Sequence, residues 1–228
     1  CKKHNIDHFI FSSSCTVYGE PDTLPITEEA PVKPAISPYG NTKQISEEII
    51  QDLCKISDIR SIALRYFNPI GAHPTSEIGE LPLGIPQNLV PFITQTAAGI
   101  REQLSVFGDD YNTPDGSCIR DYIHVVDLAK AHLVALQRII DKKEMNSFEI
   151  FNIGTGQGSS VLEVVHAFEK MSGKKINYQI VDRRPGDVTS VFADTKKANT
   201  ELKWKAELTL EEALFSAWKW EQKIRNNN

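Results

Sequence analysis

The sequence lacks the patterns that would indicate a disulfide-bonded, zinc-binding or membrane-spanning protein. It contains only four cysteines, Cys1, Cys15, Cys54 and Cys118, and none of them forms a C-x-x-C pair or a zinc-type spacing. We therefore predict no metal site and four reduced thiols, which are typical of a cytoplasmic protein. No apolar run approaches the roughly 18–20 residues of a membrane-spanning helix, so we expect no membrane contact.

An excess of positive charge is also missing. The 228 residues include 25 Lys and Arg against 30 Asp and Glu, which gives a formal net charge of −5. This balance argues against a general nucleic-acid binder, although it leaves room for a local basic pocket that holds a phosphate. The hydrophobic fraction of 40% and the charged fraction of 24% are ordinary for a globular protein.

The glycine-rich loop of a dinucleotide-binding domain is a third missing feature. No G-x-x-G-x-x-G follows an opening strand, and the chain starts at Cys1 and runs almost at once into a strand-like segment. The closest approach to such a loop is Gly154–Gly158, but Ser159 stands where G-x-G-x-x-G requires its third glycine, so we predict a structural turn there. We expect the first strands of a dinucleotide-binding domain to be missing from this chain.

Strand-like and helix-like segments alternate along the sequence, which indicates an α/β protein. Apolar runs predict strands, and capping residues followed by periodic apolar positions predict helices. Ser160-x-x-Glu163 and Thr209-x-x-Glu212 are capping boxes, and Asp127 is predicted to cap a third helix. The predicted strands cover residues 7–13, 61–67, 104–107, 148–153 and 176–180, and the predicted helices cover residues 39–54, 88–99, 127–141, 160–172, 194–202 and 209–225.

Tyr39 and Lys43 are the first candidates for catalysis. They are four residues apart on a predicted helix and therefore share one face. An ammonium group beside a phenol favours the phenolate, which can act as a general base on an alcohol. Ser14 follows a predicted strand, at the place where open α/β sheets bind ligands. By itself a Y-x-x-x-K spacing is weak evidence, because many helices carry it by chance as a surface pair.

The surrounding sequence makes the signal specific. Five segments, Ser12–Gly19, Ser37–Lys43, Leu64–His73, Gly84–Leu89 and Arg120–Asp127, closely resemble the UDP-galactose 4-epimerases of the extended short-chain dehydrogenase/reductase family, and the resemblance runs along essentially the whole chain. It implies the C-terminal part of a Rossmann-type doubly wound parallel sheet with a smaller α/β substrate-binding domain. Residues 1–68 and about 118–153 would belong to the NAD-binding domain, and residues 69–117 and 154–228 to the nucleotide-sugar domain.

The same resemblance implies a mechanism and a cofactor, NAD. Tyr39 would take the proton of the sugar 4-hydroxyl, Lys43 would favour the phenolate and hold the nicotinamide ribose, and Ser14 would bridge to the same hydroxyl. Hydride would leave the sugar C4 and return to its other face through a 4-keto intermediate. Tyr66 and Phe67 match the segment beside the nicotinamide, although Phe67 also suits a core aromatic at a strand end.

On the substrate side, the resemblance implies a UDP-hexose held by cations and polar groups. Arg120 and Arg184 match residues that grip the diphosphate. Val191 falls where some relatives carry a larger tyrosine, and a small residue there leaves room for an N-acetyl group. The remaining substrate-binding candidates are Asn68, Asn88 and Leu89 for the sugar and UDP, Val106 and Phe107 for the uracil, and Asp187 for the uridine ribose.

Several alternatives remain open at this point. Other nucleotide-sugar enzymes of the family place an acidic group at the position of Cys15 or Thr16, and neither residue is acidic here. A binding or regulatory module that has lost its cofactor half would also lack the glycine loop. We expect this chain alone to bind NAD poorly and to be inactive, and the complete enzyme to be a homodimer that pairs through helices at residues 39–54 and 97–101.

Overall fold

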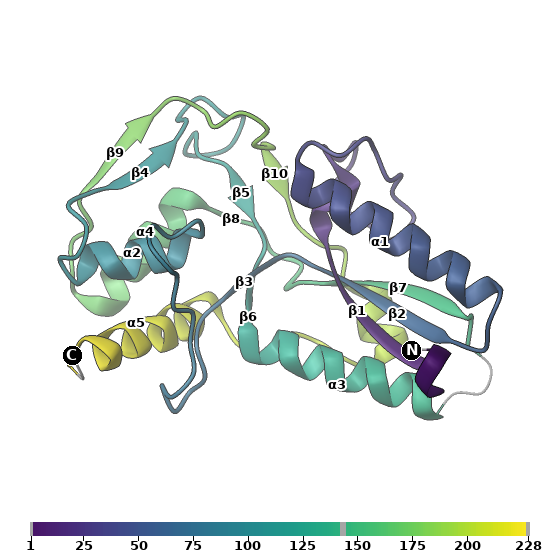
Figure 1. The fold of residues 1–228 in the computed structure, drawn as a ribbon. Coiled ribbons are helices and arrows are strands. Elements are labelled where there is room, and N and C mark those ends of the chain that lie inside the picture. The colour runs from purple at the N-terminus through teal and green to yellow at the C-terminus, as the bar shows by residue number, and fades with distance from the viewer. Residues whose placement is uncertain (1, 142–144, 227–228) are drawn as a thin grey trace. The chain divides into compact units, whose positions relative to one another are not determined.

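The computed structural model describes residues 2–141 and 145–226 (Figure 1). These residues form two compact units, each of which is built from three separate stretches of the chain. The first unit contains Cys1–Phe67, Leu128–Gln157 and Val191–Lys205, and the second contains Asn68–Asp127, Gly158–Ser190 and Ala206–Asn228.

A three-stranded parallel sheet of order β1-β2-β7 forms the centre of the first unit. Its strands are β1 (His8–Ser14), β2 (Arg60–Tyr66) and β7 (Phe148–Ile153). Every residue of β2 between its two terminal positions is buried, as expected for a central parallel strand that is covered on both faces. Ser14 pairs in register with Tyr66, and Tyr66 pairs with Ile153, so the carboxyl ends of all three strands reach one edge.

Helices α1 (Pro38–Lys55) and α3 (Val125–Asp141) cover opposite faces of this sheet (Figure 1). Successive side chains of a strand point to opposite faces, and β1 shows this directly. Ser13 contacts Glu47 of α1, whereas Ser12 lies 2.9 Å from the imidazole of His132 on α3. Helices on both faces of a parallel sheet are the doubly wound arrangement that the sequence predicts.

The second unit is held together by one apolar core. Three helices supply most of it, namely α2 (Leu89–Ala97), α4 (Val161–Ser172) and α5 (Leu210–Asn226), together with the parallel pair β4 (Leu104–Phe107) and β9 (Tyr178–Val181). At its centre the ring of Phe168 meets the ring of Trp218 edge-on, with their centroids 5.7 Å apart. Short strands complete the unit: β3 (Asn68–Ile70) pairs with β6 (Tyr122–His124), and β5 (Ile119–Arg120) pairs with β8 (Ser159–Ser160).

Most of the predicted elements are present, and the capping boxes at Ser160 and Thr209 are confirmed by reciprocal hydrogen bonds. Two predictions were wrong. Helix α3 begins at Val125, so Asp127 lies in its first turn; its carboxylate instead accepts hydrogen bonds from the backbone of Glu207 and Leu208, at 2.9 and 2.8 Å. The predicted helix over residues 194–202 is instead a short π-helical segment, Ala198–Leu202. It ends at Lys203, whose backbone is in the left-handed region with a φ of 56°.

Two further observations concern the described residues only. Cys15, Cys54 and Cys118 form no disulfide bond. No helix in these parts of the chain is both long enough and apolar enough to cross a lipid bilayer.

The core of the second unit generates a stability prediction. Replacing Phe168 by alanine should lower the free energy of unfolding by about 3–5 kcal/mol, because the cavity left beside Trp218 cannot close fully. The half-exposed Phe215 of α5 is the matched control, and its change to alanine should cost under about 1 kcal/mol. Urea unfolding followed by tryptophan fluorescence measures both, and equal losses would contradict this assignment of the core.

Candidate functional site

Tyr39 and Lys43 lie at the start of α1 in the first unit. The helix begins here because the Ser37 hydroxyl accepts a hydrogen bond from the Gly40 backbone at 3.0 Å, with Pro38 as the first helical residue. The Lys43 ammonium lies 5.4 Å from the centroid of the Tyr39 ring and donates a 2.8 Å hydrogen bond to the Ser12 carbonyl oxygen. Tyr39 is 50% exposed, so its phenol is accessible to a ligand.

Ser14 is the last residue of β1 and is buried. Its hydroxyl oxygen accepts a 3.3 Å hydrogen bond from the Thr16 backbone and so caps the 3-10 turn Cys15–Tyr18. This bond uses a lone pair of the hydroxyl and not its proton, so the group can still donate to a second acceptor. The strand end and the turn together fix the position of the Ser14 side chain.

The two predicted nicotinamide neighbours lie at the end of β2. Tyr66 is the register partner of Ser14, and its ring centroid lies 6.4 Å from that of His132. Burial raises the pKa of the Tyr66 phenol, and the charge of the Tyr39 phenolate raises it further. Phe67 is 3% exposed, and its backbone N–H donates to the Ile153 carbonyl at 3.1 Å. Its burial is that of a core residue, and a contact with a cofactor stays a prediction.

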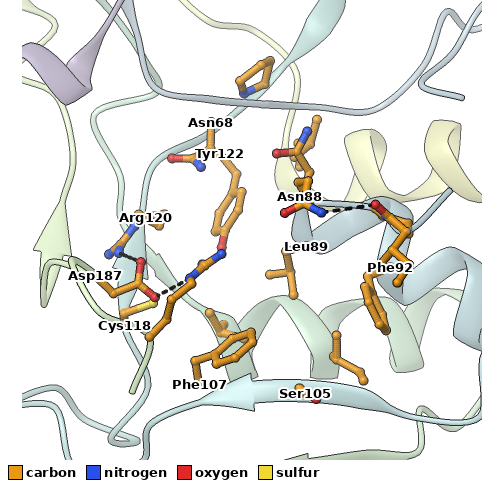
Figure 2. A pocket seen from close by; sticks show the side chains of 18 residues that line it. Asn68, Asn88, Leu89, Phe92, Ser105, Phe107, Cys118, Arg120, Tyr122 and Asp187 are labelled. Carbon is orange, nitrogen blue, oxygen red and sulfur yellow. Dashed lines mark hydrogen bonds and ion pairs between the residues drawn. The ribbon is translucent and has the colours of Figure 1, made fainter. Parts of the chain in front are cut away.

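The second unit contains a cavity of about 340 Å³ (Figure 2). Seven of the nine predicted substrate-binding residues line it: Asn68, Asn88, Leu89, Phe107, Arg120, Arg184 and Asp187. Val106 is instead buried in the core of this unit, and Val191 is buried in β10 (Ser190–Val191); neither is among the residues that line the cavity. The structure therefore gathers residues that are up to 119 positions apart in the sequence, from Asn68 to Asp187.

Two guanidinium groups share one carboxylate at this cavity. Asp187 forms ion pairs with Arg120 at 3.4 Å and with Arg184 at 3.2 Å, as Figure 2 shows for Arg120. Arg184 also lies over the Phe107 ring, 5.0 Å from its centroid, and Arg120 donates to the Ile119 carbonyl at 2.8 Å. Two cations against one anion leave a net positive charge, and arginine is the residue best suited to bind phosphate groups.

Asn88 is the residue before α2, and its side chain forms part of the cavity wall. Its side chain makes no capping hydrogen bond to the helix. The Asn88 amide instead donates to a carboxylate oxygen of Glu80 at 2.7 Å, while the Glu80 carbonyl accepts from the Trp220 indole at 2.8 Å. This chain of contacts holds the amide beside the cavity.

Eleven of the eighteen residues that line the cavity were not among the sequence candidates, and Cys118 and Tyr122 are the two of them that carry a titratable side chain. Burial raises the pKa of the Cys118 thiol; Arg120 lowers that pKa, and the Asp187 carboxylate raises it. Burial also raises the pKa of the Tyr122 phenol. The signal was present, because Cys118, Arg120 and Tyr122 alternate at a spacing of two, as residues on one face of an extended chain do. Among the described residues, no group of three or more His, Cys, Asp or Glu side chains could hold a metal ion.

Comparison with known proteins identifies the family to which this chain is similar. A family model described as GDP-mannose 4,6 dehydratase matches residues 1–216. The UDP-glucose 4-epimerase of Bacillus subtilis is 52% identical over 221 residues, which cover 96% of this chain and 64% of that protein. This chain therefore spans less than two thirds of the length of that relative.

Solved structures give the same result. The UDP-glucose 4-epimerase of Stenotrophomonas maltophila, crystallised with NAD and formylated UDP-arabinopyranose, superposes with a TM-score of 0.95 at 45% identity, covering 100% of this chain and 67% of that one. The enzyme of Bifidobacterium longum, in complex with NAD+ and UDP, gives a TM-score of 0.93 at 48% identity with the same coverage.

The α/β fold and the family match place the chain among the Rossmann-type proteins whose family model is described as GDP-mannose 4,6 dehydratase. Within that class, the chain belongs to the family of the UDP-glucose 4-epimerases. The resemblance and the Rossmann-type fold class that the sequence indicates are thereby confirmed.

The electrostatic effect of Tyr39 on the pKa of Tyr66 can be tested by titration. Replacing Tyr39 by phenylalanine removes the phenolate charge that opposes ionisation of Tyr66, so the pKa of Tyr66 should fall. Burial remains, so that pKa should stay above the value of an exposed tyrosine. Two-dimensional NMR of ring-labelled tyrosine across alkaline pH measures the shift, and an unchanged Tyr66 titration would contradict the proximity of the two phenols.

Proposed function

We propose that the protein to which these residues belong is an NAD-dependent UDP-hexose 4-epimerase that interconverts UDP-galactose and UDP-glucose. The observation that supports this most directly is the group formed by Tyr39, Lys43 and Ser14 at the start of α1 and the end of β1. We assign the unit that carries this group to the cofactor and the unit that carries the cavity to the nucleotide sugar.

The donor groups of the first unit fit the nicotinamide–ribose half of NAD. Lys43 has three N–H donors, of which the Ser12 carbonyl accepts one, so others can serve ribose hydroxyls. Tyr66 lies at the carboxyl end of its strand, where ligands of open α/β sheets bind, and it presents an aromatic surface there. When bound, NAD supplies the acceptor and donor of the hydride that leaves and rejoins C4 of the sugar.

The protein residues move the proton. Tyr39 as phenolate accepts the proton of the sugar 4-hydroxyl as that carbon becomes a ketone, and returns it when the alcohol forms again. Lys43 stabilises the phenolate by its positive charge. Ser14, whose oxygen is fixed by the Thr16 backbone, donates its hydroxyl proton to the same sugar oxygen. No acidic side chain stands at Cys15 or Thr16, so these positions offer no acid or base for elimination of water.

The cavity of the second unit suits the UDP portion of the substrate. Arg120 and Arg184 bind the diphosphate, and Asp187 accepts from a ribose hydroxyl. Phe107 and Leu89 supply apolar wall for the uracil, and Val106 supports that wall from the core, while Asn68 and Asn88 offer amides to the sugar side. We further propose a cytoplasmic homodimer, and acceptance of N-acetylated UDP-sugars because Val191 is small.

The catalytic assignment is tested by Tyr39→Phe in the full-length protein. Loss of the general base should lower kcat about 10²–10⁴-fold and leave UDP affinity unchanged. Tyr178→Phe removes a phenol that does not line the cavity and should retain wild-type kcat. A coupled assay of UDP-glucose formed from UDP-galactose measures kcat. Wild-type protein that binds UDP-galactose without turning it over would instead favour a binding module.

The diphosphate assignment is tested by neighbouring arginines. Arg184→Met should weaken UDP binding by about tenfold or more, because it removes one of the two cations at the cavity. Arg183→Met is the matched control, since Arg183 pairs with Asp110 and does not line the cavity. Isothermal titration with UDP at fixed ionic strength measures both, and equal losses would reject Arg184 as a specific ligand.

A further inference from the structure

A buried cluster of charge lies behind the catalytic group in the first unit. Arg65 of β2 binds Glu47 of α1 through two parallel hydrogen bonds of 2.9 and 2.5 Å, and the Ser13 hydroxyl donates to the same carboxylate at 2.5 Å. The side chains of Arg65 and Glu47 are only 3% and 8% exposed. Arg65 also packs over the Tyr18 ring, 4.7 Å from its centroid.

Each member of this cluster lies next to a residue of the proposed active site, either along the chain or one helical turn away. Ser13 precedes Ser14, and Arg65 precedes Tyr66, so the cluster holds both strands one residue before their functional ends. Tyr39, Lys43 and Glu47 are spaced four apart along α1 and therefore lie on one face of the helix. A displacement of Glu47 along or around the helix axis moves Lys43 and Tyr39 with it.

Stability alone does not account for charges at this position. Burying two ions costs desolvation energy, and apolar residues of similar size often hold a fold equally well. A bidentate guanidinium–carboxylate pair differs from an apolar contact because it fixes both distance and direction. Its effect is therefore to fix where α1 lies on the sheet, and not simply to attach it.

We propose that the Glu47–Arg65–Ser13 cluster sets the position of Tyr39 and Lys43 relative to the end of β1, so that Glu47 and Arg65 are positioning residues. The inference rests on the proposed function for its kinetic meaning, but its geometric content is independent of that function. Without the cluster, α1 can slide on the sheet, and the 2.8 Å contact from Lys43 to the Ser12 carbonyl is no longer fixed.

The test is the double variant Glu47→Met, Arg65→Met in the full-length protein, which removes both charges together. We expect it to fold and to bind UDP as the wild type does. Because displacement of a reacting group by about 1 Å can cost two orders of magnitude, we expect kcat to fall about 10–100-fold at nearly constant KM. The pH profile of kcat should also change, since Lys43 no longer holds its wild-type place beside Tyr39.

A second ion pair of the same unit provides a matched control. Arg138 of α3 binds Glu149 of β7 through two hydrogen bonds, at 2.6 and 3.0 Å, and the two side chains are 9% and 7% exposed; Arg138 also pairs with Glu201 at 3.2 Å. Glu149 lies near the amino end of its strand, at the opposite edge of the sheet from Ser14. The folded double variant Arg138→Met, Glu149→Met should therefore have the wild-type kcat and the wild-type pH profile of kcat.

Crystal structures of the cluster variant decide the question without an assay. We expect the distance from the Lys43 ammonium to the Ser12 carbonyl to exceed hydrogen-bond range, and the same distance in the control variant to remain near 2.8 Å. If the double variant does not fold, Arg65→Lys keeps the charge and loses the bidentate geometry, and a smaller displacement with a kcat loss of about fivefold is expected.

Two results would overturn the proposal. One is a folded cluster variant in which Lys43 and Tyr39 keep their wild-type positions. The other is a kcat of the cluster variant that stays within twofold of the wild-type value, as the kcat of the control variant does. A wild-type protein without epimerase activity would instead reject the proposed function, and the crystallographic comparison would still decide whether the cluster positions α1.

Discussion

The parallel pairing of β1, β2 and β7 is the constraint on which the proposed active site depends. Because these strands run in the same direction and pair in register, Ser14, Tyr66 and Ile153 reach one edge together. The side chains before that edge alternate between the two covering helices, Ser12 toward α3 and Ser13 toward α1. The position of α1 on the sheet then decides where Tyr39 and Lys43 lie, so backbone register and helix placement together build the proposed catalytic group.

Local patterns predicted the elements whose signals lie within a few residues. The apolar run at Phe148–Ile153 became β7, and the reciprocal boxes at Ser160 and Thr209 begin α4 and α5. The Tyr39–Lys43 spacing placed both residues on one helical face. These predictions succeeded because hydrogen bonds and periodicity within one segment determine the outcome.

Features that depend on distant partners could not be predicted in this way. Asp127 looks like a helix cap in the sequence, but its carboxylate binds backbone groups at Glu207 and Leu208 in a later loop. The bonds from Glu47 to Arg65 and Ser13 exist only after α1 packs on the sheet. Cys118 and Tyr122 carry the alternation of an extended chain, but only the folded cavity shows that this face meets a ligand-sized space.

If the cavity binds a diphosphate as proposed, the shared carboxylate of Asp187 has a consequence for which anions bind there. Both Arg120 and Arg184 already have an anionic partner within the protein, so an incoming anion must compete with a carboxylate that is held in place. A singly charged ligand offers little more than Asp187 does and gains little from the exchange. A diphosphate carries more charge and can engage both guanidinium groups at once. In that proposed role, the internal ion pairs disfavour the binding of singly charged anions and keep the arginines ordered until a multiply charged ligand binds.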